Sequence, residues 1–123
     1  LINCLKVFDE ILKNSSSNKK RMLELANSGY ITATDLADYL VKNHSMSFRK
    51  AYQKTALIVN LAEKKKKNLS DLTIEELKKI EPKLTNDVLK VFDLKNSINS
   101  KKSYGGTSFD NIKKMIMKYK KQK

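Results

Sequence analysis

The chain has few of the residues on which catalytic, metal and disulfide sites usually depend. Its 123 residues include one Cys, one His and no Trp. Cys4 cannot form an internal disulfide by itself, and Cys4 with His44 lacks the ligand spacing of a metal site. With one His, no catalytic arrangement that uses a second His is available. We therefore predict no metal site, and we expect Cys4, beside an apolar helix face, to be buried or half-buried.

Glycine and proline are also scarce, at three residues and one residue, so few positions interrupt a helix. No segment alternates apolar and polar residues for long enough to indicate a strand. Apolar residues make up 40% of the chain, below the usual ~45–50%. The sequence therefore predicts an all-α fold with a small core.

Long apolar runs are missing as well. No run approaches the ~18 residues that a membrane span requires, and the first residues do not read as a signal peptide. The chain opens at Leu1 directly in a helical pattern, with no capping residue before it. We expect the chain to be a piece of a longer protein; the alternative is a short N-terminal helix packed on its own domain. The lone Cys fits a reducing compartment, so we predict a cytoplasmic protein with no membrane partner.

The net charge of +13 is large and comes almost wholly from Lys. Basic proteins often bind nucleic acid, because phosphate neutralisation releases counterions. Only Arg21 and Arg49 are Arg, however, and Arg is the side chain that grips phosphates and bases bidentately. The one dense Lys run, at 64–67, falls where a helix should end and complements its dipole. We expect no nucleic-acid partner, with a basic helical module that binds nucleic acid as the alternative.

Residues suited to helix N-caps precede the apolar segments and divide the chain into helices. They are Asn18, Thr32, Ser47, Thr73, Thr85 and either Thr107 or Ser108. Gly29 suits the end of the second helix, and Pro82 prevents continuation of the helix capped by Thr73. The helix after Ser47 should be the longest.

Apolar spacing predicts the inward face of each helix. The predicted inward residues are Met22, Leu25 and Ala26; Leu36, Ala37, Leu40 and Val41; Phe48, Ala51, Tyr52, Ala56, Val59 and Ala62; Ile74, Leu77 and Ile80; and, on one side of the last helix, Phe109, Ile112, Ile116 and Tyr119. Leu69 and Leu72 should anchor a turn. Thr73 and Glu76 have the spacing of a capping box.

Three local features can be compared with reactive sites. Asp35 and Asp38 lie three residues apart on one predicted helix, which a helix cap and a surface ion pair explain. His44 lies in a polar break, where we expect a solvated side chain without a base-orienting partner. The GGT stretch at 105–107 is too short for a phosphate loop and should form a bend. The residues alone predict no catalytic, cofactor-binding or metal-binding residue.

Two motifs in the segment 29–52 carry a family resemblance. ATDLADYLV at 33–41 is followed, after a short break, by FRKAY at 48–52. A Leu pair in 69–72, the capped segment 73–80 and GGT at 105–107 come next. In this order and spacing, from about Arg21 onward, the chain resembles the C-terminal domain of the argininosuccinate lyases, within the fumarase and aspartase superfamily.

The chain departs from the family pattern at three places. Ser47 stands where the family usually has Pro, and both residues suit a helix start. Tyr52 stands where the family has His, so no polar role of that His is carried over. Ser108 and Phe109 follow GGT, where the family often has a small residue and Pro.

The resemblance implies a homotetramer built around a bundle of long helices. Its members cleave argininosuccinate to arginine and fumarate without a cofactor. The family's base is a Ser in a mobile GSSxMPxKxNP loop, and a His takes part in the site. Residues 15–22, SSSNKKRM, lack the MPxKxNP part, and no stretch matches the His motif. We therefore assign no catalytic residue to this chain.

The resemblance and the residues together predict a small multi-helix domain that follows the end of a long bundle helix. Residues 1–18 would be that helix end with its connection, and 19–123 the C-terminal domain that covers the active-site cleft. We expect the chain alone to be inactive, and to self-associate through the exposed face of Leu1, Leu5, Phe8 and Leu12. The alternative within the superfamily is a lyase such as one acting on adenylosuccinate, which would be expected to lack the paired motifs.

Overall fold

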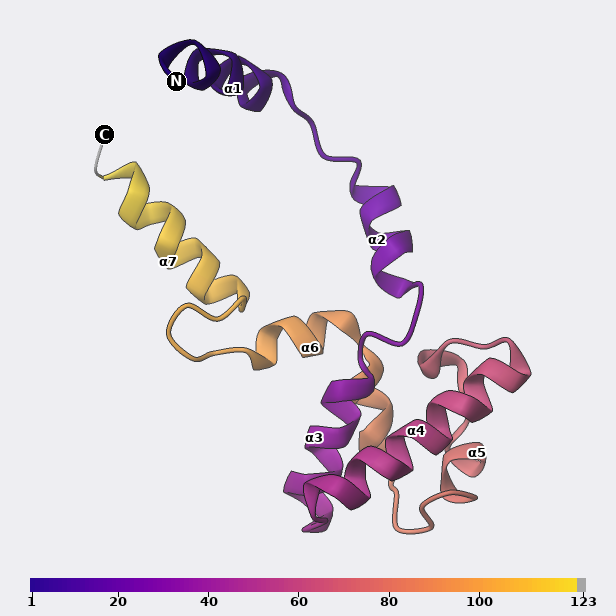
Figure 1. Ribbon diagram of the computed structural model, residues 1–123. Coiled ribbons are helices and arrows are strands. Elements are labelled where there is room, and N and C mark those ends of the chain that lie inside the picture. Colours follow the sequence, from indigo (N-terminus) through magenta and orange to yellow (C-terminus); the bar gives the residue numbers. More distant parts are fainter. Residues whose placement is uncertain (122–123) are drawn as a thin grey trace.

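Helices form every regular element in the part of the chain that the structure describes. The computed structural model describes residues 1–121, so the last two residues of the predicted domain 19–123 lie outside it. The elements are α1 (Ile2–Asn14), α2 (Lys19–Asn27), α3 (Ala33–His44), α4 (Phe48–Lys65), the 3₁₀ helix η1 (Leu69–Asp71), α5 (Ile74–Lys78), the 3₁₀ helix η2 (Asn86–Phe92), α6 (Leu94–Ser100) and α7 (Phe109–Lys120) (Figure 1). No strand occurs in residues 1–121, and the predicted all-α fold is confirmed.

The core lies where α3 packs against both α4 and η2. Its largest fully buried side chains are Leu36, Leu40, Ile58, Leu77, Leu84 and Val88. Burial of each such side chain contributes roughly 1.5–3 kcal/mol. The predicted inward face of α3 is confirmed for Leu36, Ala37 and Leu40. Leu69 and Leu72 anchor the turn after α4 as expected.

The buried face of α4 differs from the predicted one. Ala51, Thr55, Ile58 and Ala62 are buried, a spacing of four, three and four residues that keeps one line along the helix. Phe48 and Tyr52, both predicted inward, are 65% and 63% exposed. The predicted set combined residues from two adjacent lines of the helix. Ala51 and Ala62 belong to the buried line, whereas Tyr52, Ala56 and Val59 each come one residue after a member of that line. The small Ala side chains of the true line let α3 approach closely.

Three helices lie apart from this core. Figure 1 shows α1 and α2 extending from one side of the α3–α4 body and α7 projecting beyond α6. None of the three has a buried residue. The expectations that Met22 and Leu25 point inward and that Cys4 is at least half-buried are therefore wrong, because these helices pack on no core in the described chain. The apolar side of α7 is likewise exposed.

No helix in residues 1–121 is both long enough and apolar enough to cross a membrane.

Side-chain caps begin four of the predicted helices. The side chains of Asn18, Ser47, Thr73 and Ser108 each accept a hydrogen bond from the backbone N–H three residues on. Thr32 makes no such bond: a preceding turn, in which the Ala33 N–H donates to the Tyr30 carbonyl at 2.9 Å, already leads into α3. Thr85 makes none either, since it begins a 3₁₀ helix through its backbone carbonyl.

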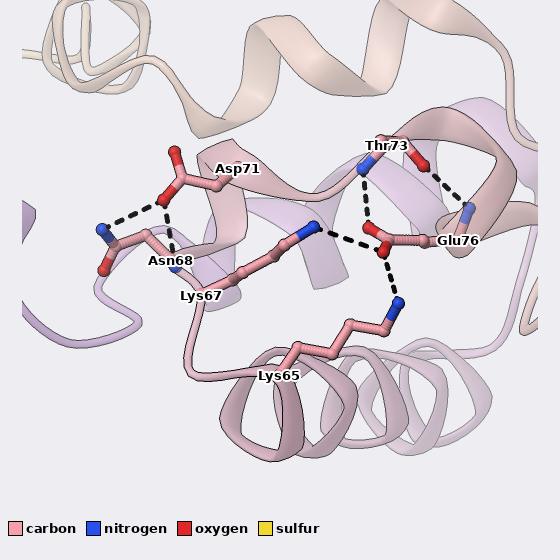
Figure 2. A network of polar contacts seen from close by, with 6 residues as sticks. All are labelled: Lys65, Lys67, Asn68, Asp71, Thr73 and Glu76. Atoms are coloured by element: carbon pink, nitrogen blue, oxygen red, sulfur yellow. Dashed lines mark hydrogen bonds and ion pairs between the residues drawn. The ribbon is translucent and has the colours of Figure 1, made fainter.

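The end of α4 is joined to the start of α5 by one carboxylate (Figure 2). The Thr73 N–H donates to Glu76 Oε2 at 2.9 Å, and the Glu76 N–H donates to Thr73 Oγ1 at 3.3 Å, which confirms the predicted capping box. Lys65 Nζ lies 2.5 Å from Glu76 Oε1, and Lys67 Nζ lies 3.4 Å from it. The hydrogen bond from Lys65, with that from Thr73, lowers the pKa of Glu76 to about 2. Lys65 and Lys67 therefore connect the end of α4 to the start of α5 through Glu76.

Candidate functional site

A cavity of about 470 Å³ opens between α3, η2 and α6. Each of the three helices contributes polar side chains, and Tyr39 and Val91 add apolar surface. The lining residues are Asp35, Asp38, Tyr39, Lys42, Asn43, Asp87, Lys90, Val91, Asn96, Ser97, Ser100 and Lys101. A volume in the range of ~300–1,000 Å³ is typical of small-molecule sites. This cavity is therefore a candidate site for a small molecule.

Asp35 organises one wall of this cavity. Lys101 Nζ lies 2.5 Å from Asp35 Oδ1, and the Ser97 hydroxyl donates to Asp35 Oδ2. The Asp35 side chain is only 15% exposed. Its burial alone would raise the pKa of the carboxyl, but the hydrogen bonds from Lys101 and Ser97 outweigh that effect and lower the pKa. The same hydrogen bond raises the pKa of Lys101. Both groups are therefore ionised and occupied with one another.

This arrangement confirms part of the explanation of Asp35 and Asp38 from sequence. Asp35 lies in the first turn of α3 and forms an ion pair with the 47% exposed Lys101, although neither carboxylate makes a capping bond. The partners of Asp35 come some sixty residues later in the chain. Asp38 is exposed and has no ion pair within residues 1–121. Sequence spacing offered no signal for Ser97 and Lys101, since nothing local couples α6 to α3.

His44 also differs from the expectation of a solvated side chain. It is the last residue of α3 and is half-buried. Its ring meets the Tyr39 ring edge-on, with the two ring centroids 5.6 Å apart. Its Nε2 is buried and has no hydrogen-bond partner among the described residues. His44 directly precedes Ser45, whose left-handed conformation ends the helix. The His44 ring lies against Tyr39 and is not fully solvated.

The FRKAY motif lies at the start of α4 and faces solvent. Phe48 and Tyr52 are both exposed, and their rings stack with centroids 6.4 Å apart. Ala51 alone of the motif is buried, at 0% exposure, in the line against α3. The motif therefore combines one packing residue with an exposed aromatic pair, and Tyr52 forms half of that pair.

The GGT stretch forms the predicted bend between α6 and α7. Gly105 has φ +76°, and a Cβ on Gly106 would lie 2.2 Å from the Lys101 carbonyl oxygen. The Gly106 N–H donates to the Ser103 carbonyl at 2.8 Å. Gly106 thus allows the backbone of the bend to lie close to the backbone of Lys101. Within residues 1–121, no group of three His, Cys, Asp or Glu side chains could hold a metal ion.

The sequence of this chain is similar to that of known proteins. The family profile described as "Argininosuccinate lyase C-terminal" matches residues 30–99, from the turn before α3 into α6. A protein of Pelagibacter ubique named argininosuccinate lyase is 75% identical over 121 residues, which are 98% of this chain and 26% of that protein. The argininosuccinate lyase of Ehrlichia chaffeensis is 43% identical over 98% of this chain, and that of Nitratiruptor sp. is 45% identical over 91%.

The chain spans about a quarter of the length of these curated relatives. The match covers the paired motifs at 33–41 and 48–52, the core built from α3, α4 and η2, and most of the cavity wall. The resemblance noted from the sequence is thus confirmed by profile and by identity. This chain belongs to the argininosuccinate lyase family, and it corresponds to the C-terminal domain.

Proposed function

We propose that the chain is the C-terminal, non-catalytic domain of an enzyme that cleaves argininosuccinate to arginine and fumarate. One observation carries this proposal: 75% identity along 98% of the chain to a relative named argininosuccinate lyase. In such a reaction a base removes a proton next to a carboxylate, and the resulting carbanion expels the guanidinium nitrogen as the double bond of fumarate forms. No cofactor is needed for that sequence of steps.

The side chains of this domain support a non-catalytic role. Both oxygens of Asp35 accept hydrogen bonds from within the domain, so this carboxylate is not available as a base. Glu76 is likewise held by Lys65 and Thr73. The base of the reaction would then come from the part of the parent outside this chain. The charge of +13 is the only observation that favours a nucleic-acid module, and we propose no such partner.

The domain division is part of the proposal. Residues 1–18 would be the end of a central-bundle helix with its connection, and 19–123 would be the domain that covers the active-site cleft of a cytoplasmic homotetramer. The exposed apolar face of α1, formed by Leu1, Leu5, Phe8 and Leu12, supports this division because it packs on no core within residues 1–121. In the isolated chain the same face would favour self-association. Closure of the domain would exclude water from the cleft and strengthen its electrostatics.

A chimeric enzyme tests the proposal. Residues 1–123 replace the matching segment of the Pelagibacter ubique protein, and cleavage of argininosuccinate is followed by fumarate release. We expect turnover within a few-fold of the unmodified protein. A second chimera ends before Leu69 and so lacks the segment 69–123. We expect it to lose activity. Sedimentation shows whether its quaternary structure is retained. A folded full chimera that releases no fumarate would contradict the proposed function, and unchanged turnover after truncation would contradict the covering role.

A further inference from the structure

We propose that the cavity between α3, η2 and α6 binds a zwitterionic α-amino acid, with the ligand carboxylate against Lys42 and the ligand ammonium group against Asp38. This binding site is inferred from the cavity itself and does not rest on the proposed lyase activity. Its test uses binding as the readout, so the two proposals can fail separately.

The cavity is a built structure with three walls. α3 supplies one wall, η2 the second and α6 the third. Asp35 of α3 accepts hydrogen bonds from Ser97 of α6 and from Lys101, the residue that follows α6. Asn96 adds a bond across the other two walls, since its Nδ2 donates to the Lys90 carbonyl of η2 at 3.3 Å. These bonds hold the walls at a fixed separation before any ligand arrives, which lowers the entropy cost of binding.

The charges in the cavity favour a ligand that carries both signs. Three Lys and three Asp line it. Four of these side chains form ion pairs with each other. Asp35 pairs with Lys101. Asp87 pairs with Lys90, and its Oδ1 lies 2.8 Å from Lys90 Nζ. Asp38 and Lys42 have no ion pair within residues 1–121 although both line the cavity. These two side chains therefore offer one anionic and one cationic contact.

The two unpaired charges, Asp38 and Lys42, belong to α3, the helix that also carries Asp35. The positive charge of Lys42 contributes to lowering the pKa of Asp35, and the negative charge of Asp38 contributes to raising the pKa of Lys101. Positive and negative side chains thus line the same cavity. A simple anion beside Lys42 would also meet the carboxylates of the cavity, and a simple cation beside Asp38 would meet its ammonium groups. A ligand that presents a carboxylate and an ammonium group together avoids both repulsions.

The remaining lining fits an amino-acid side chain of moderate length. Tyr39 and Val91 give an apolar surface, and Asn43 and Asn96 add amide groups to the lining. The volume of about 470 Å³ leaves room for the ligand and bridging water.

Titration of the isotope-labelled 123-residue chain, followed by amide NMR, tests the site. The amino-acid probes are arginine, aspartate and alanine. The probes that carry charge of one sign only are fumarate, inorganic phosphate and putrescine. We expect saturable amide shifts in α3, η2 and α6 with at least one amino acid, and binding at least about ten-fold weaker for every probe with charge of one sign. At saturation, intermolecular NOEs from the amino acid should reach the ring of Tyr39 and the methyl groups of Val91, which places the ligand without any substitution.

Two substitutions separate the site from general charge effects. Lys42→Met and Asp38→Asn should each weaken amino-acid binding about ten-fold, since each removes one charged contact from an exposed position that has no ion pair to lose. The matched controls Lys78→Met on α5 and Asp110→Asn on α7 lie outside the cavity and should leave binding unchanged. The proposal is overturned if no amino acid gives saturable shifts, or if a probe with charge of one sign binds as tightly as the best amino acid. It is also overturned if the NOEs are absent, or if both cavity variants bind like their controls.

Discussion

Asp35 and Lys101 are separated by 66 positions in the sequence, yet their side chains form an ion pair with Oδ1 and Nζ 2.5 Å apart. The pair joins the first turn of α3 to the residue that follows α6. The Lys101 carbonyl also accepts the Ser108 N–H at 3.2 Å, at the start of α7. One Lys therefore connects the core, the cavity wall and the bend that leads into the last helix.

Replacing Asp35 by Asn should lower the free energy of unfolding by about 1 kcal/mol, because the amide keeps the shape but loses a charge-assisted pair that solvent partly screens on the Lys101 side. Urea denaturation followed by circular dichroism measures the change. The exposed Asp87–Lys90 pair provides the matched control, and Asp87→Asn should cost less than about 0.5 kcal/mol. Equal losses in the two variants would contradict the structural role assigned to Asp35.

Stability should fall in acid through Glu76. Its pKa is lowered in the folded chain from an ordinary 4.5 to about 2, chiefly by the hydrogen bond from Lys65. The folded state therefore favours the carboxylate, so this stabilisation is complete above pH 4.5 and is lost as pH falls toward 2. The urea midpoint measured across this window should fall for the wild type and fall less steeply for Glu76→Gln. The neighbouring variant Glu75→Gln should retain the wild-type slope, and the same flattening in both variants would contradict this account.

The two Thr residues at N-cap positions should differ in their effect. Thr73→Ala removes a hydroxyl that accepts from the Glu76 N–H, and it should cost about 1 kcal/mol. Thr85 precedes η2 without a side-chain cap bond, so Thr85→Ala should cost less than about 0.5 kcal/mol. Thermal unfolding of both variants gives the comparison. A larger loss at Thr85 would show that the capping geometry is wrong.

The chain by itself should self-associate through α1. Leu5, Phe8 and Leu12 are each 57–59% exposed along one side of the helix. Sedimentation velocity over a range of concentrations should show a rising weight-average mass for the wild type. Phe8→Glu should shift the chain toward monomer, because a charge would enter the apolar contact. Asn3→Glu adds the same charge on the opposite side of α1 and should change little; a concentration-independent monomer in every case would rule out this interface.

Local rules predicted much of the fold. Cap residues and Gly29, at φ +80°, marked helix ends, and the periodic Leu residues of α3 marked its buried face. The register of α4 was harder, because Ala, Phe and Tyr occupy two adjacent lines and hydropathy does not tell which line meets α3. The inward faces of α2 and α7 could not be placed at all from periodicity, since an amphipathic helix shows which side is apolar but not what covers it.

The candidate site was far less predictable. Asp35 was visible as an acidic residue in a first helical turn, but its partners Ser97 and Lys101 are brought to it by the tertiary fold. His44 was expected in water because its neighbours are polar, whereas the edge contact with Tyr39 depends on how α3 ends. The family motif supplied what local chemistry lacked, because FRKAY marks a lyase domain although its exposed residues reveal no reaction.

Fumarate release, measured side by side for the chain and for the chimera that carries it, tests the central claim most directly. With argininosuccinate as substrate, the account predicts enzymatic turnover from the chimera with the Pelagibacter ubique protein and none above background from the 123-residue chain. Turnover by the chain alone, or none by a folded tetrameric chimera, would contradict the claim that this domain serves a lyase whose reactive groups lie outside it.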